Sequence, residues 1–386
     1  MTASLYEKNN RWHVMLSWYM GGIRKQKSVK TGVPVKDNKT KRKAEMKQIR
    51  ILNEWTNKII EDVEEELFCE YMKRWLGNIR ISIAETTYHS YKNTIDKIIY
   101  PYFKGKGIKL HELNKQHIQD FYDWRRSEGG VSGSTIRRHH ANIRKALQDA
   151  VKDEIIKSNP ADKVNLPKKE KFTGDFYTPD ELKTLLLAVK GTRLEAPVML
   201  AAWFGLRRGE VAGVRWESID FDSMTLRIDG VVTNIRDGPP SEKEVFRASA
   251  KTEESIRTFP LPIEAAEYLK KVRQDQEENR KLSGDSYNEK WKGFVCIDEM
   301  GNLIHLDYIS NMFAKTLKRL KLRTIRFHDL RHTNITLLLE SGASMKDVQA
   351  WAGHKTISTT MDIYAHVQAK SKQRLADMMS GIIGNC

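Results

Sequence analysis

Residues 11–18 alternate between apolar and polar side chains, and a period of two is the pattern of a half-buried β-strand. Trp12, Val14, Leu16 and Trp18 alternate with polar neighbours, and Met15 is the exception. Strands are expected at residues 4–6, 12–18 and 23–29, with turns at 8–10 and at Gly21-Gly22. A helix is expected from about residue 41 to 59, with Met46, Ile49, Leu52 and Ile59 on its apolar side.

From about residue 61 the apolar positions take helical spacing. Helices are expected at residues 67–78, 85–99, 115–127 and 134–153, with N-caps from Thr86-Thr87 and from residues 132–134. The last of them has an apolar side of Ile136, Ile143, Leu147 and Val151, and a charged side of Arg137, Arg138, His139, His140, Arg144 and Lys145. Such a division suits a helix that faces a DNA backbone, although a solvated basic face gives the same pattern. The adjacent histidines lack the carboxylate or cysteine neighbours of a metal site.

Asn159-Pro160 ends this helical stretch, and the charged residues 166–174 are expected to form a linker. Beyond it, Thr178 and Pro179 begin a helix, residues 196–204 form an apolar helix, and strands are expected within 225–232 and 250–262. Residues 275–288 show no apolar period and are expected to be a loop or a frayed helix end. Two more helices are expected, at 333–340 with a stop at Ser341-Gly342, and around Met345, Val348 and Trp351.

These elements predict an α+β, multidomain chain. Its parts are a small three-stranded sheet with one helix at residues 1–60, a helical domain at 61–167, and a mainly α domain with a small β-sheet at 172–386. A length of 386 residues is sufficient for that many cores.

The charge of the chain is strongly positive and unevenly distributed. The formal net charge is +16, and residues 1–60 hold 14 Lys and Arg against 4 Asp and Glu, which is ten of the sixteen excess charges. Such a concentration predicts a surface for phosphates and makes nucleic acid the expected partner. The three cysteines are far apart, which disfavours a zinc site or a disulfide framework and favours a reducing cytoplasm. The sequence shows neither a signal peptide nor an apolar run of membrane-spanning length.

The most informative stretch is 328–364, which contains His328, Arg331, Gly353-His354 and Tyr364 in that order. Upstream, Gly205-Leu206-Arg207 is followed three residues later by Glu210, and Lys251 lies in a turn before an expected strand. Each residue alone has an ordinary structural explanation. Their order within one domain is a specific signal.

This ordered set resembles the two conserved boxes of the tyrosine recombinases, the phage-integrase family. The resemblance implies that Arg207, Lys251, His328, Arg331, His354 and Tyr364 are catalytic, with Tyr364 as the nucleophile. Lys243 competes with Lys251 for the position of the lysine. Arg208 is expected to be a backbone contact or a surface charge, and Glu210 to orient its neighbours. His332 and His366 lie beside the set and are expected to be structural.

These residue types suit the breaking of a phosphodiester by transesterification. The ordinary pKa of a tyrosine is about 10, so the nucleophile needs nearby cations or a base such as His328. Arg207 and Arg331 offer paired donors to the non-bridging oxygens. Lys251 suits protonation of the leaving 5′ oxygen, and His354 suits a bond to a non-bridging oxygen. This chemistry requires no cofactor, metal or ATP.

The resemblance also implies the partners of the chain. These are double-stranded DNA, with core-type sites for residues 61–167 and arm-type sites for 1–60, and three further protomers in a tetramer that exchanges strands through a Holliday junction. The tail after Tyr364 is similar to a helix that packs onto a neighbouring subunit. An excisionase and a DNA-bending host protein are expected accessories of an integrase of a phage or conjugative element in a bacterial cytoplasm. The alternatives are a type IB topoisomerase, a DNA-binding regulator that has lost catalysis, and a metal-dependent nuclease.

Overall fold

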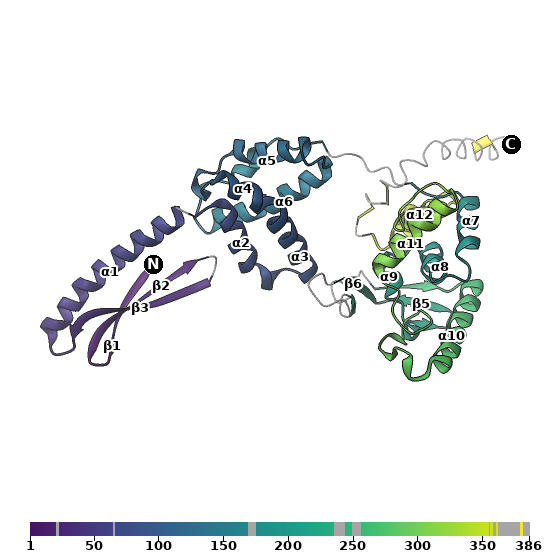
Figure 1. Ribbon diagram of the computed structural model, residues 1–386, viewed down its shortest axis with the longest axis horizontal. Helices are drawn as coiled ribbons and strands as arrows, with labels where there is room; N and C mark the ends of the chain where they lie inside the picture. Colours follow the sequence, from purple (N-terminus) through teal and green to yellow (C-terminus); the bar gives the residue numbers. More distant parts are fainter. Residues whose placement is uncertain are drawn as a thin grey trace. The chain divides into compact units, whose positions relative to one another are not determined.

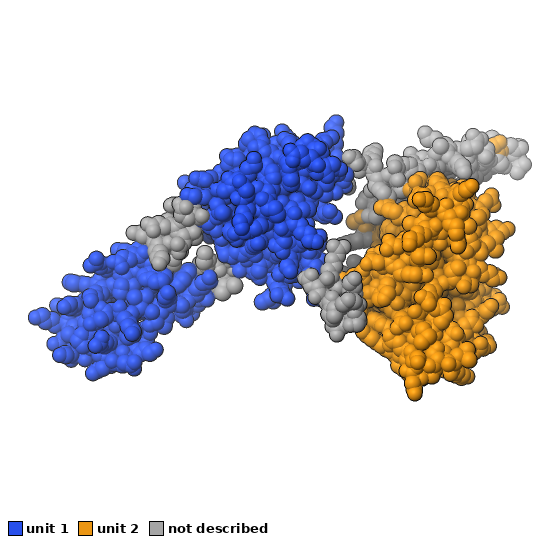
Figure 2. All heavy atoms as spheres, viewed as in Figure 1, with its two compact units in different colours: residues 1–170 blue, residues 171–386 orange. Residues whose placement is uncertain are grey.

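The computed structural model describes residues 1–20, 23–64, 66–168, 175–234, 244–248, 256–354, 356–357, 360–361 and 379–380. The chain divides into two compact units, residues 1–170 and residues 171–386, which are coloured separately in Figure 2. Of the expected linker at 166–174, residues 169–174 lie outside the described ranges. The boundaries at 60 and 167 therefore stay predictions, and each unit is described by itself.

Unit 1 begins with an antiparallel sheet in the order β1-β2-β3 (Figure 1). The strands span Thr2–Lys8, Arg11–Met20 and Ile23–Pro34, longer than expected but at the predicted places. Asn9 and Asn10 both have positive φ, 54° and 58°, as the two central residues of a tight hairpin turn require. The predicted turn at Gly21-Gly22 lies outside the described residues.

Helix α1, Asn38–Glu64, packs on this sheet with a different face from the predicted one. Met46 and Ile49 are 74% and 62% exposed, so the predicted apolar side is wrong for these two residues. Ala44 is fully buried instead, and Trp55, eleven residues on, contacts Trp18 with ring centroids 6.2 Å apart. The side of α1 that carries Ala44 and Trp55 therefore faces the sheet.

The rest of unit 1 is helical. The elements are α2 Phe68–Asn78, α3 Glu85–Thr94, a wide π-type turn Ile95–Ile99, α4 Tyr100–Lys106, α5 Lys115–Ser127 and α6 Gly133–Lys152. The helix expected at 85–99 thus continues to Lys106, because the wide turn accommodates Pro101. Ser132 caps α6 as predicted, but α3 begins after Ala84, so Thr86 and Thr87 lie in the helix and do not cap it.

The charged side predicted for α6 includes one residue that belongs to the core. His139 is 1% exposed, and its ring lies 6.2 Å from that of Phe121. Burial, with the nearby charges of Arg125 and Arg138, lowers the pKa of His139 to about 4, so it is neutral at neutral pH. His140 is half-buried and bonds to the Tyr122 hydroxyl at 3.0 Å.

Unit 2 combines two small antiparallel sheets with several helices (Figure 1). One sheet has the order β4-β5-β8, and the other pairs β6 with β7. The strands are β4 Ile219–Asp220, β5 Thr225–Ile228, β6 Gly230–Asn234, β7 Glu244–Ala248 and β8 Arg257–Pro260. The helices are α7 Pro179–Val189, α8 Glu195–Phe204, α9 Arg208–Ala212, α10 Ile263–Ser283, α11 Leu306–Arg319, α12 Asp329–Glu340 and α13 Met345–Ala352.

The sequence predicts a loop or a frayed helix end at residues 275–288, but up to Ser283 these residues belong to the regular helix α10. Few of its side chains are buried, so an apolar period is absent although the helix is regular. Polar contacts hold it instead. Gln276 accepts a bond from Trp216 and donates to the Val295 carbonyl, and Gln274 bonds Glu278 one turn later.

The core of unit 2 joins strand β8 to helices from both ends of the unit. The Phe259 side chain is 1% exposed and contacts Phe204 of α8 and Trp351 of α13, with ring centroids 5.4 and 4.7 Å apart.

Among the described residues every helix is too short or too polar to cross a membrane. The described residues also contain no group of three metal-binding side chains.

Candidate active site

The site is assembled where α8 ends. Gly205 closes α8 with a φ of +60°, which favours glycine. A β-carbon at Gly205 would lie 2.7 Å from Oδ1 of Asn334, whose amide nitrogen donates to the carbonyls of Ala202 and Trp203. The glycine therefore allows α12 to pack against the end of α8, two residues before Arg207.

Arg331 is the central buried cation of this site. Its side chain comes from α12 and is only 1% exposed. Its guanidinium donates to the Gly205 carbonyl at 2.7 Å and to the Ala352 carbonyl, so one side chain joins the ends of α8 and α13. Burial, together with the positive charge of Arg207, lowers the pKa of Arg331 to about 9.

Arg207 lies beside the same turn and is more open. Its side chain is 43% exposed, and its Nη2 donates to the Gly353 carbonyl at 3.2 Å. Its Nη1 and its backbone N–H both donate to Glu210, each at 2.8 Å. The open face of Arg207 and the buried Arg331 thus flank the Gly353-His354 turn.

The two histidines of the set are held neutral in this structure. Burial lowers the pKa of His328 to about 4, with contributions from His332 and Arg331. Burial and the charges of Arg331 and Arg207 do the same for His354, whose pKa is also about 4. The Nδ1 atom of His354 bonds the Thr360 hydroxyl at 2.9 Å, which fixes the ring.

The structure brings together four of the six predicted residues, Arg207, His328, Arg331 and His354. Lys251, its competitor Lys243, and Tyr364 lie outside the described residues, as does His366. Arg208 turns inward to α11 and donates to the Leu306 carbonyl and the Ser310 hydroxyl.

The prediction from the sequence missed Arg257. Its guanidinium binds Glu210 through two hydrogen bonds, of 2.7 and 3.3 Å, and the two side chains are only 9% and 6% exposed. The signal was available in the period of two of the expected strand, because Arg257 falls on the same face as the buried Phe259.

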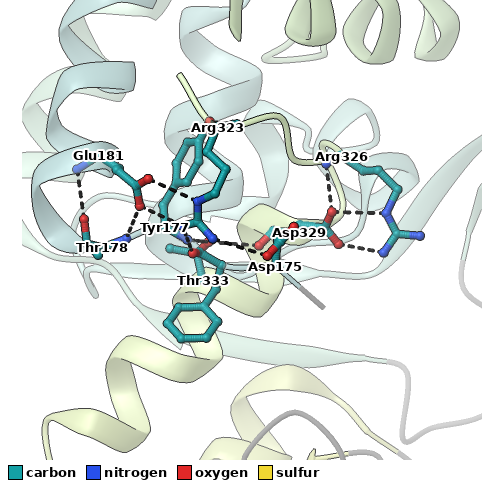
Figure 3. Close-up of polar contacts among 9 residues, drawn as sticks. Asp175, Tyr177, Thr178, Glu181, Arg323, Arg326, Asp329 and Thr333 are labelled. Atoms are coloured by element: carbon teal, nitrogen blue, oxygen red, sulfur yellow. Dashed lines mark hydrogen bonds and ion pairs between the residues drawn. The ribbon is translucent and has the colours of Figure 1, made fainter. Parts of the chain in front are cut away.

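A second arginine network fixes the start of unit 2 to α12 (Figure 3). Arg323 donates to Glu181 and Asp175 and to the Phe176 carbonyl, and the Arg323 carbonyl accepts a bond from the Tyr177 hydroxyl. The Tyr177 backbone N–H donates to the Thr333 hydroxyl at 3.0 Å, and that hydroxyl donates to the Asp329 carbonyl. The first residues after the predicted linker are therefore attached to the helix that holds Arg331.

Asp329 connects this network with the histidines. Its carboxylate accepts a 2.7 Å bond from the backbone N–H of Arg326 and two bonds from the Arg326 guanidinium, of 3.1 and 2.7 Å. It also lies 3.8 Å from Nε2 of His332. The rings of His332 and His328 are 5.2 Å apart and perpendicular. His332 therefore packs between Asp329 and His328.

Comparison with known proteins agrees with this assembly. Residues 175–371 match the phage integrase family, and residues 67–166 match the phage integrase SAM-like domain. A XerC-like tyrosine recombinase of Caldanaerobacter subterraneus subsp. tengcongensis is 30% identical over 89% of this chain and 90% of its own length. The ICEBs1 integrase of Bacillus subtilis is 25% identical over 80% of this chain and 81% of its own length.

Solved structures share the fold at lower identity. The Tn1549 transposon integrase, bound to a circular intermediate DNA, has a TM-score of 0.65 at 17% identity and covers 80% of this chain and 99% of its own. A lambda integrase tetramer on a Holliday junction has a TM-score of 0.58 at 18% identity and covers 93% and 94% of the two chains.

The chain belongs to the phage integrase family. It is therefore an enzyme, a tyrosine site-specific recombinase of the type that phages and other mobile elements carry. The α+β, multidomain class and the enzyme class predicted from the sequence are confirmed.

Proposed function

We propose that this recombinase integrates and excises a mobile element by forming a 3′-phosphotyrosyl link between DNA and Tyr364. The observation that carries the proposal is the placement of Arg207, Arg331 and His354 around one turn, ten residues before Tyr364 in the sequence. Two fixed guanidiniums can stabilise the charge that develops on the non-bridging oxygens, which is typically the largest catalytic contribution.

In this mechanism the Tyr364 oxygen attacks the phosphorus and the bond to the 5′ oxygen breaks. His328, neutral because of its lowered pKa, accepts the tyrosine proton. Lys251 donates a proton to the leaving 5′ oxygen, and His354 donates a hydrogen bond to a non-bridging oxygen. A 5′ hydroxyl of a second strand then reverses the attack, releases Tyr364 and completes the exchange without a cofactor.

In this proposal, unit 1 carries two DNA-binding surfaces. Residues 1–60 bind arm-type sites, because Arg24, Lys25, Lys27 and Lys30 are all exposed on β3 and can contact phosphates. Residues 61–167 bind core-type sites on duplex DNA. Four protomers act together in the synaptic complex, and an excisionase and a DNA-bending host protein set the direction.

A nicked suicide duplex that carries the junction between the encoding element and its host DNA tests the proposal. With EDTA present, the wild-type chain is expected to form a covalent adduct that mass spectrometry maps to Tyr364. Tyr364→Phe should bind the duplex and form no adduct, whereas Tyr308→Phe, a matched change on α11, should behave as wild type. An adduct retained by Tyr364→Phe would place the nucleophile elsewhere.

A further inference from the structure

Glu210 binds two arginines through one buried carboxylate. Its Oε1 accepts bonds from Nη1 of Arg207 and Nη1 of Arg257, and its Oε2 accepts from the Arg207 backbone N–H and Nη2 of Arg257. Four donors fill the acceptor positions of a carboxylate. Burial alone would raise the pKa of Glu210, but the bonds and charges of Arg257 and Arg207 outweigh it and lower the pKa to about 2.

Arg257 also supports the turn that carries His354. Gly353 has a φ of +62°, and a β-carbon there would lie 3.2 Å from Nη1 and 3.4 Å from Cδ of Arg257. The Gly353 backbone therefore lies directly against the Arg257 side chain, while the Gly353 carbonyl accepts a bond from Arg207. One arginine thus contacts both the carboxylate that orients Arg207 and the turn that precedes His354.

The two arginines differ in how firmly they are held. Arg257 lies on β8, which pairs with β5, and the next inward residue of that strand, Phe259, packs between Phe204 and Trp351. Arg207 lies at the start of the five-residue helix α9 with its side chain 43% exposed. The rigid residue is therefore able to fix the position of the exposed one.

The positive charge of Arg257 also changes the electrostatic field at Arg207. If Glu210 paired with Arg207 alone, its negative charge would cancel most of the field that Arg207 presents to a phosphate. Arg257 supplies a second positive charge to the same carboxylate, so Arg207 and Arg331 keep their net attraction for an anion. Stability alone does not require this arrangement, since apolar residues often replace a buried ion pair at little cost.

We propose that Arg257 is a positioning residue for the recombination reaction: it neutralises Glu210 and supports the Gly353-His354 turn. Through these contacts Arg257 keeps Arg207 in its catalytic position and preserves the attraction of Arg207 for the phosphate. Arg257 itself does not touch the reacting phosphate in this scheme. The inference rests on the proposed function, because the role of Arg207 belongs to that proposal.

The test measures the rate of adduct formation with the suicide duplex at saturating enzyme, separately from duplex affinity. Arg257→Met keeps the apolar stem of the side chain and removes the charge. It should slow the adduct about 10- to 100-fold, the scale of a misplaced catalytic group, and change duplex affinity less than about threefold. Arg257→Lys, which keeps the charge without the paired donors, should fall between Arg257→Met and wild type.

The double variant Arg257→Met, Glu210→Gln gives the decisive result. Removing the carboxylate charge should return part of the lost rate, so the double variant should react several-fold faster than Arg257→Met alone. Arg227→Met is the matched control, because Arg227 is exposed on the neighbouring strand β5 opposite Thr258. It should keep the wild-type rate.

Thermal unfolding of each variant reports whether it is folded at the assay temperature. If Arg257→Met is unfolded there, Arg257→Lys replaces it in the test. An Arg257→Met or Arg257→Lys rate equal to wild type would overturn the inference alone, and so would a double variant no faster than Arg257→Met. Absence of an adduct on Tyr364 in the wild type would overturn the proposed function, and the inference with it.

Discussion

Glu181 and Glu210 occupy the same local position in two different helices of unit 2. Each is the third residue of its helix, and each accepts a 2.8 Å bond from the backbone N–H of the residue that caps the helix, Thr178 or Arg207. Each also binds an arginine from a distant element, Arg323 in the first case and Arg257 in the second.

Burial separates the two sites. The Glu181 and Arg323 side chains are 26% and 42% exposed, whereas those of Glu210 and Arg257 are 6% and 9% exposed. Exposed ion pairs contribute about 0 to 1 kcal/mol, because water screens them. Breaking one side of a buried pair costs far more, since the remaining charge has no water to replace its partner. The same local motif therefore starts a helix in one place and constrains a proposed catalytic arginine in the other.

The largest expected difference comes from removing each carboxylate. Glu210→Ala should lower the free energy of unfolding of unit 2 by about 3 to 5 kcal/mol, because Arg257 is left buried and unpaired. Glu181→Ala should cost about 1 kcal/mol, the value of a helix cap and an exposed pair. Hydrogen exchange of the buried amides of α8 and α12 measures both changes. Equal losses would contradict the distinction by burial.

The next largest effect is expected at Thr333, which links the Arg323 network to α12, the helix that holds Arg331 (Figure 3). Thr333→Val removes the acceptor of the Tyr177 N–H, and an unsatisfied buried donor costs about 1 to 3 kcal/mol. Thr336→Val is the matched control on α12, since the Thr336 hydroxyl is buried and bonds no other described residue. Urea unfolding of the two variants should show a loss for Thr333→Val only. A similar loss in both would mean that side-chain shape, and not the bond, is responsible.

Acid should weaken the Glu210 site in a defined interval of pH. A carboxylate whose pKa is lowered in the folded state stabilises the fold above its unfolded pKa, and that contribution is lost as the pH falls towards the folded pKa. For Glu210 the interval runs from about 4.5 down to about 2. Between pH 5.5 and 3.5, wild type should lose about 1 kcal/mol more than Glu210→Gln. Urea titrations at the two pH values measure this difference, and parallel losses would contradict it.

The smallest expected difference between the Glu181 and Glu210 sites is in how salt changes the effect of removing the arginine. The destabilisation caused by Arg323→Gln should be below about 1 kcal/mol and should shrink as salt rises from 0.05 to about 0.5 M, because exposed charges are screened. The destabilisation caused by Arg257→Gln should change little over the same range. Thermal unfolding across the salt series tests the pair, and a salt-sensitive effect at Arg257 would indicate that water reaches Glu210.

Local signals predicted much of the fold correctly. The three N-terminal strands, the Asn9-Asn10 turn, the helix start at Thr178 and the helix stop at Ser341-Gly342 all depend on neighbouring residues in the chain. The errors arose where a helix meets a partner. Ala44 rather than Met46 faces the sheet, and α10 is helical to Ser283 without an apolar period.

The sequence by itself determined the family and the order of the candidate residues, because short boxes of specified residue types are local. Only the tertiary structure decided that Arg331 is buried between two carbonyls and that Arg257, 47 residues from Glu210, shares its carboxylate. Burial and long-range pairing depend on which elements pack together. The contribution of a Glu–Arg contact to stability therefore depends on the tertiary structure around it.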